Sequence, residues 1–166
     1  MNWLKRFFRH VWMSPLILRQ RFPAATLSAI AAAIARGEAT HNGQVRFVIE
    51  AELTTSQLWA DVNSRERAFE IFSQFQVWDT EANNGVLVYV LLADRKVEIM
   101  ADRGIHKHVG SERWQAICRE VELNYRKGDF LVGSIAAIDK ITTELAHYYP
   151  AKAGQANEQP DHPVVL

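Results

Sequence analysis

An uninterrupted run of seven apolar residues, from Val86 to Leu92, constrains the fold of this chain more than any other feature. A run of this length without a polar residue is typical of a strand buried on both faces, so we predict a central strand. Residues 44–50 alternate and then become continuously apolar, which predicts a second strand with at least one covered face. Residues 96–101 alternate throughout and follow a short turn at Asp94-Arg95, so they predict a half-exposed third strand in a hairpin with the central one.

Apolar and amphipathic segments with helical spacing surround these strands. They predict helices over the ranges 24–35, 64–75, 111–128 and 129–149. The order helix, strand, helix, strand, strand, helix, helix predicts an α/β fold. We expect a three-layer α/β/α sandwich whose mixed, mostly parallel sheet contains a β-hairpin and carries helices on both faces. A right-handed crossover through residues 64–75 makes the first two strands parallel.

The chain divides into three parts. Residues 1–22 form a basic amphipathic N-terminal segment, residues 23–149 an α/β domain, and residues 150–166, which lack apolar periodicity, a flexible C-terminal tail. The single cysteine, Cys118, excludes a disulfide scaffold and a Cys-rich zinc module. Because it falls on the predicted apolar face of its helix, we expect an unreactive packed thiol.

The charges of the chain are unevenly distributed. Lys plus Arg and Asp plus Glu number 19 each, and the zero net charge argues against a nucleic-acid partner. No acidic residue occurs before Glu38, although the same stretch contains one lysine and five arginines. Its apolar runs are too short for a transmembrane helix and lack the cleavage site of a signal peptide. We therefore expect a cytoplasmic protein that is either free or associated with a membrane surface.

The N-terminal segment contains an amphipathic basic helix. Its large apolar residues recur at helical spacing, with basic residues between them, as in helices that lie in a membrane interface. The candidate membrane contacts are Trp3, Phe7, Phe8, Trp12, Lys5, Arg6 and Arg9. The alternative is that the apolar stripe packs on the domain or on a second subunit, which is the commoner use of such a stripe. We expect packing and keep lipid binding as the alternative.

Polar residues gather at both edges of the predicted sheet. Glu50, Glu52, Asp94 and Arg95 follow the carboxyl ends of the two parallel strands. At the opposite edge lie Asp79, Thr80, Asn83, Asn84, Asp102, Arg103, His106 and His108. The oxygen-rich second group suits a hard cation such as Ca²⁺ or Mg²⁺, although Asp and Asn are equally typical of turns. Arg103 and Arg126 are candidate anion-binding residues, with a surface ion pair as the alternative for Arg103.

No P-loop, dinucleotide-binding glycine motif, nucleophile elbow or HExxH motif is present in the sequence. Five ordered segments nevertheless resemble the TPM domain family. They are Thr40-His41-Asn42-Gly43-Gln44-Val45, Asn84-Gly85-Val86-Leu87-Val88-Tyr89-Val90, Asp94-Arg95-Lys96-Val97-Glu98-Ile99, Asp102-Arg103-Gly104-Ile105 and Tyr125-Arg126-Lys127-Gly128-Asp129-Phe130 with Gly133. The resemblance covers residues from about 25 to 149 and leaves out the N-terminal segment and the tail.

The resemblance implies a Rossmann-like α/β/α sandwich. A plant member of the family is described as an acid phosphatase, and some bacterial members bind divalent cations in a cleft lined by acidic loop residues. Carried over position by position, the metal ligands implied are Asn84, Asp102 and Asp129, with Asp79 and Asn83 beside them. Asn83 and Gln44 stand where many relatives have acidic residues, so we expect at most a weak Ca²⁺ or Mg²⁺ site.

Two functions follow from these observations. The first is a binding or assembly module whose partner is another protein or a membrane surface. The alternative is a metal-assisted, acid-phosphatase-like hydrolase. The sequence leaves the substrate, the partner and the oligomeric state open.

Overall fold

The computed structural model describes residues 3–151 and 159–166 and contains a four-stranded sheet with the strand order β3-β2-β1-β4. β1 (Gln44–Glu50) runs parallel to β2 (Gly85–Leu91), with Gln44 opposite Gly85. β3 (Lys96–Ala101) is antiparallel to β2 and completes the predicted hairpin. Every residue of β1 and β2 is buried, as the apolar run predicts for a central strand. The predicted mixed sheet is therefore confirmed.

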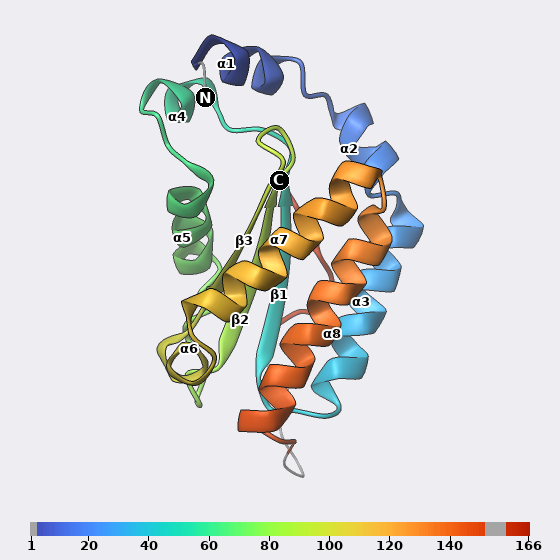
Figure 1. The fold of residues 1–166 in the computed structure, drawn as a ribbon, viewed down its shortest axis with the longest axis vertical. Coiled ribbons are helices and arrows are strands. Elements are labelled where there is room, and N and C mark those ends of the chain that lie inside the picture. Colours follow the sequence, from blue (N-terminus) through green and yellow to red (C-terminus); the bar gives the residue numbers. More distant parts are fainter. Residues whose placement is uncertain (1–2, 152–158) are drawn as a thin grey trace.

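Helices cover both faces of this sheet, which gives the predicted three layers (Figure 1). One face packs against α3 (Ala24–Glu38), α7 (Ser111–Lys127) and α8 (Phe130–Tyr148). The other packs against α4 (Thr55–Trp59) and α5 (Ser64–Gln74). Side chains alternate along the strands between the two cores: Val88 and Val90 point to the first, Leu87 and Tyr89 to the second.

Three short helices escape the sequence analysis. α2 (Pro15–Arg21) begins where Ser14 accepts a hydrogen bond from the backbone N–H of Ile17 and Pro15 occupies the first helical turn. Ser14 as the N-cap and Pro15 in the first turn are typical of a helix start. α4 begins with a capping box formed by Thr54 and Gln57. α6 (Arg103–Val109) begins at Asp102, whose side chain accepts a hydrogen bond from the N–H of Arg103.

The C-terminal residues depart from the expectation of a tail without regular structure. β4 (Val164–Val165) pairs in parallel with β1, with Val48 opposite Val164. Arg46 Nη1 donates to the carbonyl oxygen of Pro160 at 2.7 Å, which fixes the approach of this segment to the sheet edge. Two paired residues are too few to produce a periodic pattern, so this strand is not predictable from the sequence. Residues 152–158 of the predicted tail lie outside the described residues.

Candidate functional site

The amino-terminal edge of β2 holds the core of the predicted metal site. Asn84 is fully buried, its N–H donates to Thr80 Oγ1 at 3.0 Å, and its Nδ2 donates to Asn42 Oδ1 at 3.0 Å. Asp102 is also buried and caps α6, since its Oδ1 accepts from the N–H of Arg103 at 2.6 Å. Its own N–H donates to the carbonyl oxygen of Gly85 at 2.8 Å, which places it beside the start of β2.

Three buried polar atoms at this edge lack a hydrogen-bond partner among the described residues. They are Asn84 Oδ1, Asp102 Oδ2 and His41 Nε2. Burial lowers the pKa of His41 to about 4, so the ring is neutral at pH 7. Its Nδ1 lies 3.1 Å from the carbonyl oxygen of Gly43, and donation there leaves a lone pair on Nε2. Carboxylate and amide oxygens suit a hard cation, and Asp102 and Asn84 each present one such unpartnered oxygen at this edge.

The other predicted ligands do not complete the set. Asp79 and Asn83 have exposed side chains, although the carbonyl oxygen of Asn83 accepts from the N–H of Ile105 at 3.2 Å. Asp129 precedes α8, while Tyr149, whose carbonyl oxygen accepts from the N–H of Asn42, follows it. A helix of 19 residues is about 28 Å long, so Asp129 lies at the opposite end of the domain. Among the described residues no three His, Cys, Asp or Glu side chains form a group that could hold a metal ion.

The two candidate anion-binding arginines also lie far apart. Arg103 is exposed at the start of α6, whereas Arg126 is exposed in the last turn of α7. Arg126 Nη2 lies 3.5 Å from Glu122 Oε2, one turn earlier on the same helix. The two arginines therefore cannot act on one anion.

At the carboxyl edge of the sheet, Asp94 binds three basic side chains of α1 (Trp3–Val11). Its carboxylate lies 2.9 Å from Arg6 Nη2, 2.9 Å from Arg9 Nη2 and 3.2 Å from His10 Nε2. His10 Nδ1 accepts from the N–H of Leu53 at 2.9 Å, so the proton of a neutral ring resides on Nε2 and faces Asp94. Arg6 also reaches Asp61 Oδ1 at 3.2 Å. The strand pattern predicts Asp94 at this edge, but its basic partners are more than 80 residues away in the chain and no pattern in the sequence indicates them.

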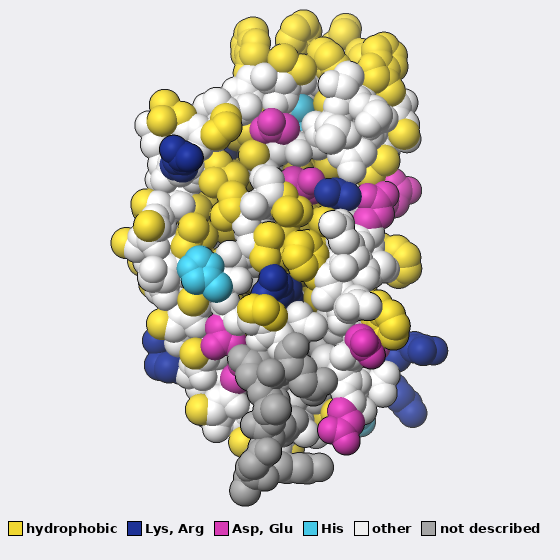
Figure 2. Space-filling model, turned by 180° about the vertical axis from the view of Figure 1, so that it is seen from behind, with side chains coloured by type: hydrophobic (Ala, Val, Ile, Leu, Met, Phe, Trp, Pro, Cys, Tyr) yellow, Lys and Arg dark blue, Asp and Glu magenta, His cyan; other side chains and the backbone are white. Residues whose placement is uncertain are grey.

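This buried cluster turns α1 so that Arg6, Arg9 and His10 face the domain. The apolar residues on the far side of α1 and at the start of α2 are exposed: Leu4 by 55%, Phe8 by 50%, Val11 by 54%, Trp12 by 76% and Leu16 by 66%. We call these five side chains the apolar cap. Figure 2 shows hydrophobic side chains projecting from the upper end of the molecule, where Figure 1 places α1. Phe8 and Trp12 therefore do not pack on the domain, because Arg6 and His10 occupy the inner face of α1, and a second subunit or a membrane surface remains as their expected partner.

Part of the stripe does pack inward. Trp3 stacks on Phe7 with ring centroids 5.3 Å apart and meets Trp59 at 5.0 Å. Phe7 also packs against the core beneath α5. Of the predicted membrane contacts, Phe8, Trp12 and Lys5 are exposed, Arg6 is buried, and Trp3, Phe7 and Arg9 are half-buried.

A second buried cluster lies beside the first at the carboxyl edge. Glu50 accepts a hydrogen bond from the hydroxyl of Tyr89 at 2.5 Å and from Arg67 Nη2 at 2.8 Å. Burial, followed by the charge of Glu50 and its hydrogen bond, raises the pKa of Tyr89 well above its usual range. Arg67 comes from α5, so the cluster ties this helix to the sheet. No periodicity or motif in the sequence marks Arg67 for this role.

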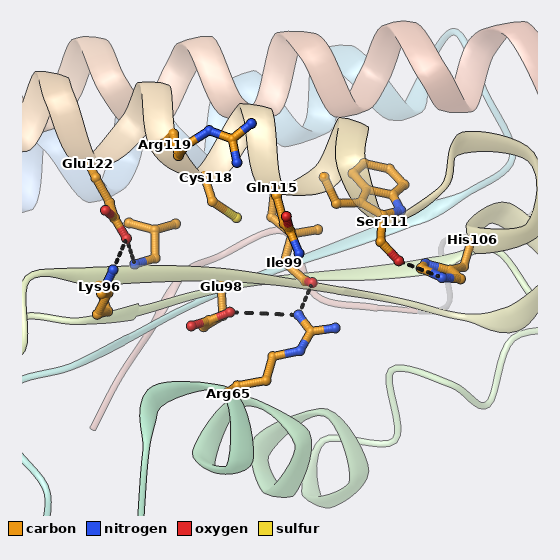
Figure 3. A pocket seen from close by; sticks show the side chains of 12 residues that line it. Arg65, Lys96, Glu98, Ile99, His106, Ser111, Gln115, Cys118, Arg119 and Glu122 are labelled. Carbon is orange, nitrogen blue, oxygen red and sulfur yellow. Dashed lines mark hydrogen bonds and ion pairs between the residues drawn. The ribbon is translucent and has the colours of Figure 1, made fainter.

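A groove of about 390 Å³ borders the outer edge of β3, between α5 and α7 (Figure 3). Side chains bind the backbone groups of this edge: Glu122 Oε1 accepts from the N–H of Val97 at 3.3 Å, and Arg65 Nη1 donates to the carbonyl oxygen of Ile99 at 2.8 Å. Such contacts protect an edge strand from pairing with another chain. Burial and the charge of Glu98 raise the pKa of Cys118 to about 12, in agreement with an unreactive thiol.

Comparisons with known proteins agree with this architecture. The family model of the TPM domain matches residues 19–144. Among solved structures, the NMR structure of the BA42 protein from the psychrophilic bacterium Bizionia argentinensis is similar, with a TM-score of 0.74 and 28% sequence identity. The match covers 86% of this chain and 94% of that one. No curated protein matches the chain. Among the described residues no helix is long and apolar enough to cross a membrane.

Proposed function

The chain belongs to the TPM domain family, and from this premise and the geometry above we propose that it is a binding module that docks on a membrane surface through α1. The observation that carries the proposal is the apolar cap, five large side chains exposed together at one end of the molecule. Isolated exposed apolar residues need no explanation, but a contiguous group marks a surface that binds something. The proposal places the protein at the cytoplasmic side of a membrane as a peripheral protein.

The orientation of α1 is fixed by burial of its polar face. Rotating the helix to hide the apolar cap would expose the Asp94 carboxylate and separate it from Arg6 and His10. Breaking a buried ion pair costs about 3–5 kcal/mol, so the cap stays outward. Entering the membrane interface would instead stabilise each half-exposed side chain by about 1 kcal/mol or more.

Charge favours a lipid surface over a second copy of the chain as the occupant. Exposed cations, Lys5 on α1 and Arg19 on α2, flank the cap, and the segment before Glu38 contains no acidic residue. Two copies meeting through this end would bring like charges together, whereas anionic lipid head groups attract them. Arg6 and Arg9 do not contribute to this attraction, because Asp94 binds both.

Co-sedimentation with vesicles tests the proposal. We expect the wild-type protein to bind vesicles of phosphatidylcholine in which about one lipid in three is anionic phosphatidylglycerol. The double variant Phe8→Ser with Trp12→Ser should bind these vesicles at least tenfold more weakly. The matched control is Phe69→Ser, which removes an equally exposed phenylalanine from α5. Melting temperatures of all variants should agree closely. Unchanged binding by the double variant, or a wild-type dimer that the double variant abolishes, would contradict membrane docking.

A second candidate function is metal-assisted hydrolysis at the amino-terminal edge of β2. It is favoured by the buried, unpartnered oxygens of Asn84 and Asp102. A bound Ca²⁺ or Mg²⁺ would polarise a phosphoryl oxygen there. With only one carboxylate in the pair, we expect a rise in melting temperature of about one or two degrees at millimolar Ca²⁺, since stabilisation follows the logarithm of ligand concentration over dissociation constant. Asp102→Asn keeps the helix-capping oxygen and should abolish the rise, as well as any turnover of p-nitrophenyl phosphate.

A further inference from the structure

Four cationic side chains surround a pocket near the apolar cap. The pocket has a volume of about 390 Å³ and is lined by Arg21, Arg95, Arg126 and Lys127, with Glu122 as its one carboxylate. These residues come from the end of α2, the β2–β3 turn and the last turn of α7. Segments far apart in the sequence therefore bring like charges to one place.

The single carboxylate does not neutralise these cations. Glu122 Oε1 already accepts from the N–H of Val97 and lies 3.3 Å from Lys96 Nζ, while its Oε2 lies 3.5 Å from Arg126. Among the residues that the structure describes, Arg21, Arg95 and Lys127 form no ion pair. Burial and the charge of Arg95 lower the pKa of Arg21, which agrees with two guanidinium groups near one another. An anion between them would relieve this repulsion.

Arg95 also has a backbone conformation that is unfavourable for an arginine. Its φ of 55° is left-handed, a conformation that glycine and asparagine adopt more easily in a tight turn. Residues held in such a conformation are concentrated at active sites and ligand-binding sites. The side chain of Arg95 lines the pocket and is exposed to solvent, so a ligand in the pocket can contact its guanidinium group.

The floor of the pocket is apolar. Phe130 and Tyr125 lie there with ring centroids 4.9 Å apart, beside Val90 of β2 and Leu92 of the turn that follows β2. The guanidinium carbon of Arg21 lies 5.4 Å from the centroid of Phe130, a stacking distance that holds the charge at the pocket. A cationic rim over an apolar floor fits an anion that is joined to an organic group better than it fits a free inorganic ion.

We infer that this pocket binds a phosphate monoester, with the guanidinium groups of Arg21, Arg95 and Arg126 donating to the phosphate oxygens. A phosphate monoester carries close to two negative charges at pH 7 and three acceptor oxygens, and arginine donates to it in bidentate fashion. The group is present both in soluble organic phosphates and in the head group of phosphatidic acid. The site does not depend on membrane docking, although its place near the apolar cap suits a lipid as well as a soluble ligand.

The test titrates the full chain with glycerol 3-phosphate at constant ionic strength and follows the amide signals of Gly128 and Phe130 by NMR. We expect saturable shifts. Arg95→Asn should weaken binding at least tenfold without lowering the melting temperature, because asparagine suits the left-handed turn. Arg21→Gln should also weaken it at least tenfold, while Lys107→Gln, an exposed cation on α6 at the other end of the domain, should not.

A second arm distinguishes the two sources of phosphate. Saturable binding of glycerol 3-phosphate identifies a soluble ligand, whereas pocket-dependent binding of phosphatidic acid vesicles alone identifies a lipid head group; both support the site. The inference is overturned if neither binds, or if binding survives both Arg95→Asn and Arg21→Gln. Failure of membrane docking would look different: Phe8→Ser with Trp12→Ser would leave vesicle binding intact, whatever happens to glycerol 3-phosphate.

Discussion

At the scale of single residues, Asp94 combines burial with three basic neighbours. Burial alone would raise the pKa of its carboxyl group, but the hydrogen bonds of His10 and Arg6 and the charge of Arg6 outweigh burial and lower the pKa to about 2. A carboxyl group whose pKa is lowered by folding stabilises the folded state above its ordinary pKa of 3.8. That stabilisation disappears as the pH falls through about 2.

We therefore predict that Asp94→Asn lowers the free energy of unfolding by about 3 kcal/mol at pH 7, because it removes the buried counter-ion of Arg6, which is itself buried, and of Arg9. The difference between the variant and the wild-type protein should shrink below pH 4 and be small at pH 2, where about half of the Asp94 carboxyl groups are protonated. Urea unfolding between pH 2 and 7 measures this. Asp61→Asn is the control: Asp61 also contacts Arg6 but is 83% exposed, so its loss should cost about 1 kcal/mol at most. A difference that is independent of pH would contradict the assigned role of Asp94.

Other residues show which roles a sequence reveals. Asn84 and Asp102 are both predictable at one edge of the sheet, because Asn84 precedes the first strand of the hairpin and Asp102 follows the second. The residue with a left-handed conformation before β2 is Asn83, with a φ of 53°. Gly85 is required for space, since a Cβ there would lie 1.9 Å from the carbonyl oxygen of Val77. A close approach between segments leaves no pattern in the sequence.

At the scale of elements, the strands and long helices were predictable because each repeats its apolar residues over several turns or pleats. The bounds of β1 and β3 agree with the predicted ranges 44–50 and 96–101. α2, α4 and α6 have five to seven residues each, too few for a period, and only their caps at Ser14, Thr54 and Asp102 mark them. β4 exists through pairing with β1 and has no signal of its own.

The amphipathic pattern of α1 predicted a helix correctly but did not predict which face lies inward. An apolar stripe normally faces the core, and the stabilisation of buried apolar surface supports that expectation. Here the choice depends on Asp94, which supplies a buried counter-charge from the β2–β3 turn. A partner so distant in the chain is invisible to a helical pattern, so the candidate membrane contacts divided into exposed and buried groups only in the folded structure.

At the scale of the whole molecule, the two ends of the parallel strands differ in character. The carboxyl end carries the apolar cap and the cationic pocket, whereas the amino end carries the unpartnered oxygens of Asn84 and Asp102. The seven residues of β2 separate these ends by about 23 Å. The zero net charge of the whole chain therefore does not describe either end. A lipid surface would bind the carboxyl end, which carries the apolar cap and the cationic pocket, in preference to the amino end.

This polarity predicts a fixed orientation on a membrane. Trp12, in the apolar cap, is exposed, and so is Trp78, which follows Val77 beside the start of β2 at the opposite end. Vesicles containing phosphatidylglycerol and lipids brominated in their acyl chains quench only tryptophans that enter the membrane interface. We expect the wild-type protein to show quenching, Trp12→Phe to lose most of it, and Trp78→Phe to retain it, so that the two variants serve as controls for each other.

High salt should weaken the quenching without changing which tryptophan reports it, because screening acts on the exposed cations such as Lys5 and Arg19 and not on the apolar cap. A docked helix whose charges are internally paired should retain part of its binding at 0.5 M NaCl, where the Debye length falls to about 4 Å. Equal loss of quenching in Trp12→Phe and Trp78→Phe would mean that the molecule adsorbs without a preferred end. In that case the buried cluster around Asp94 would serve only to hold α1 on the domain.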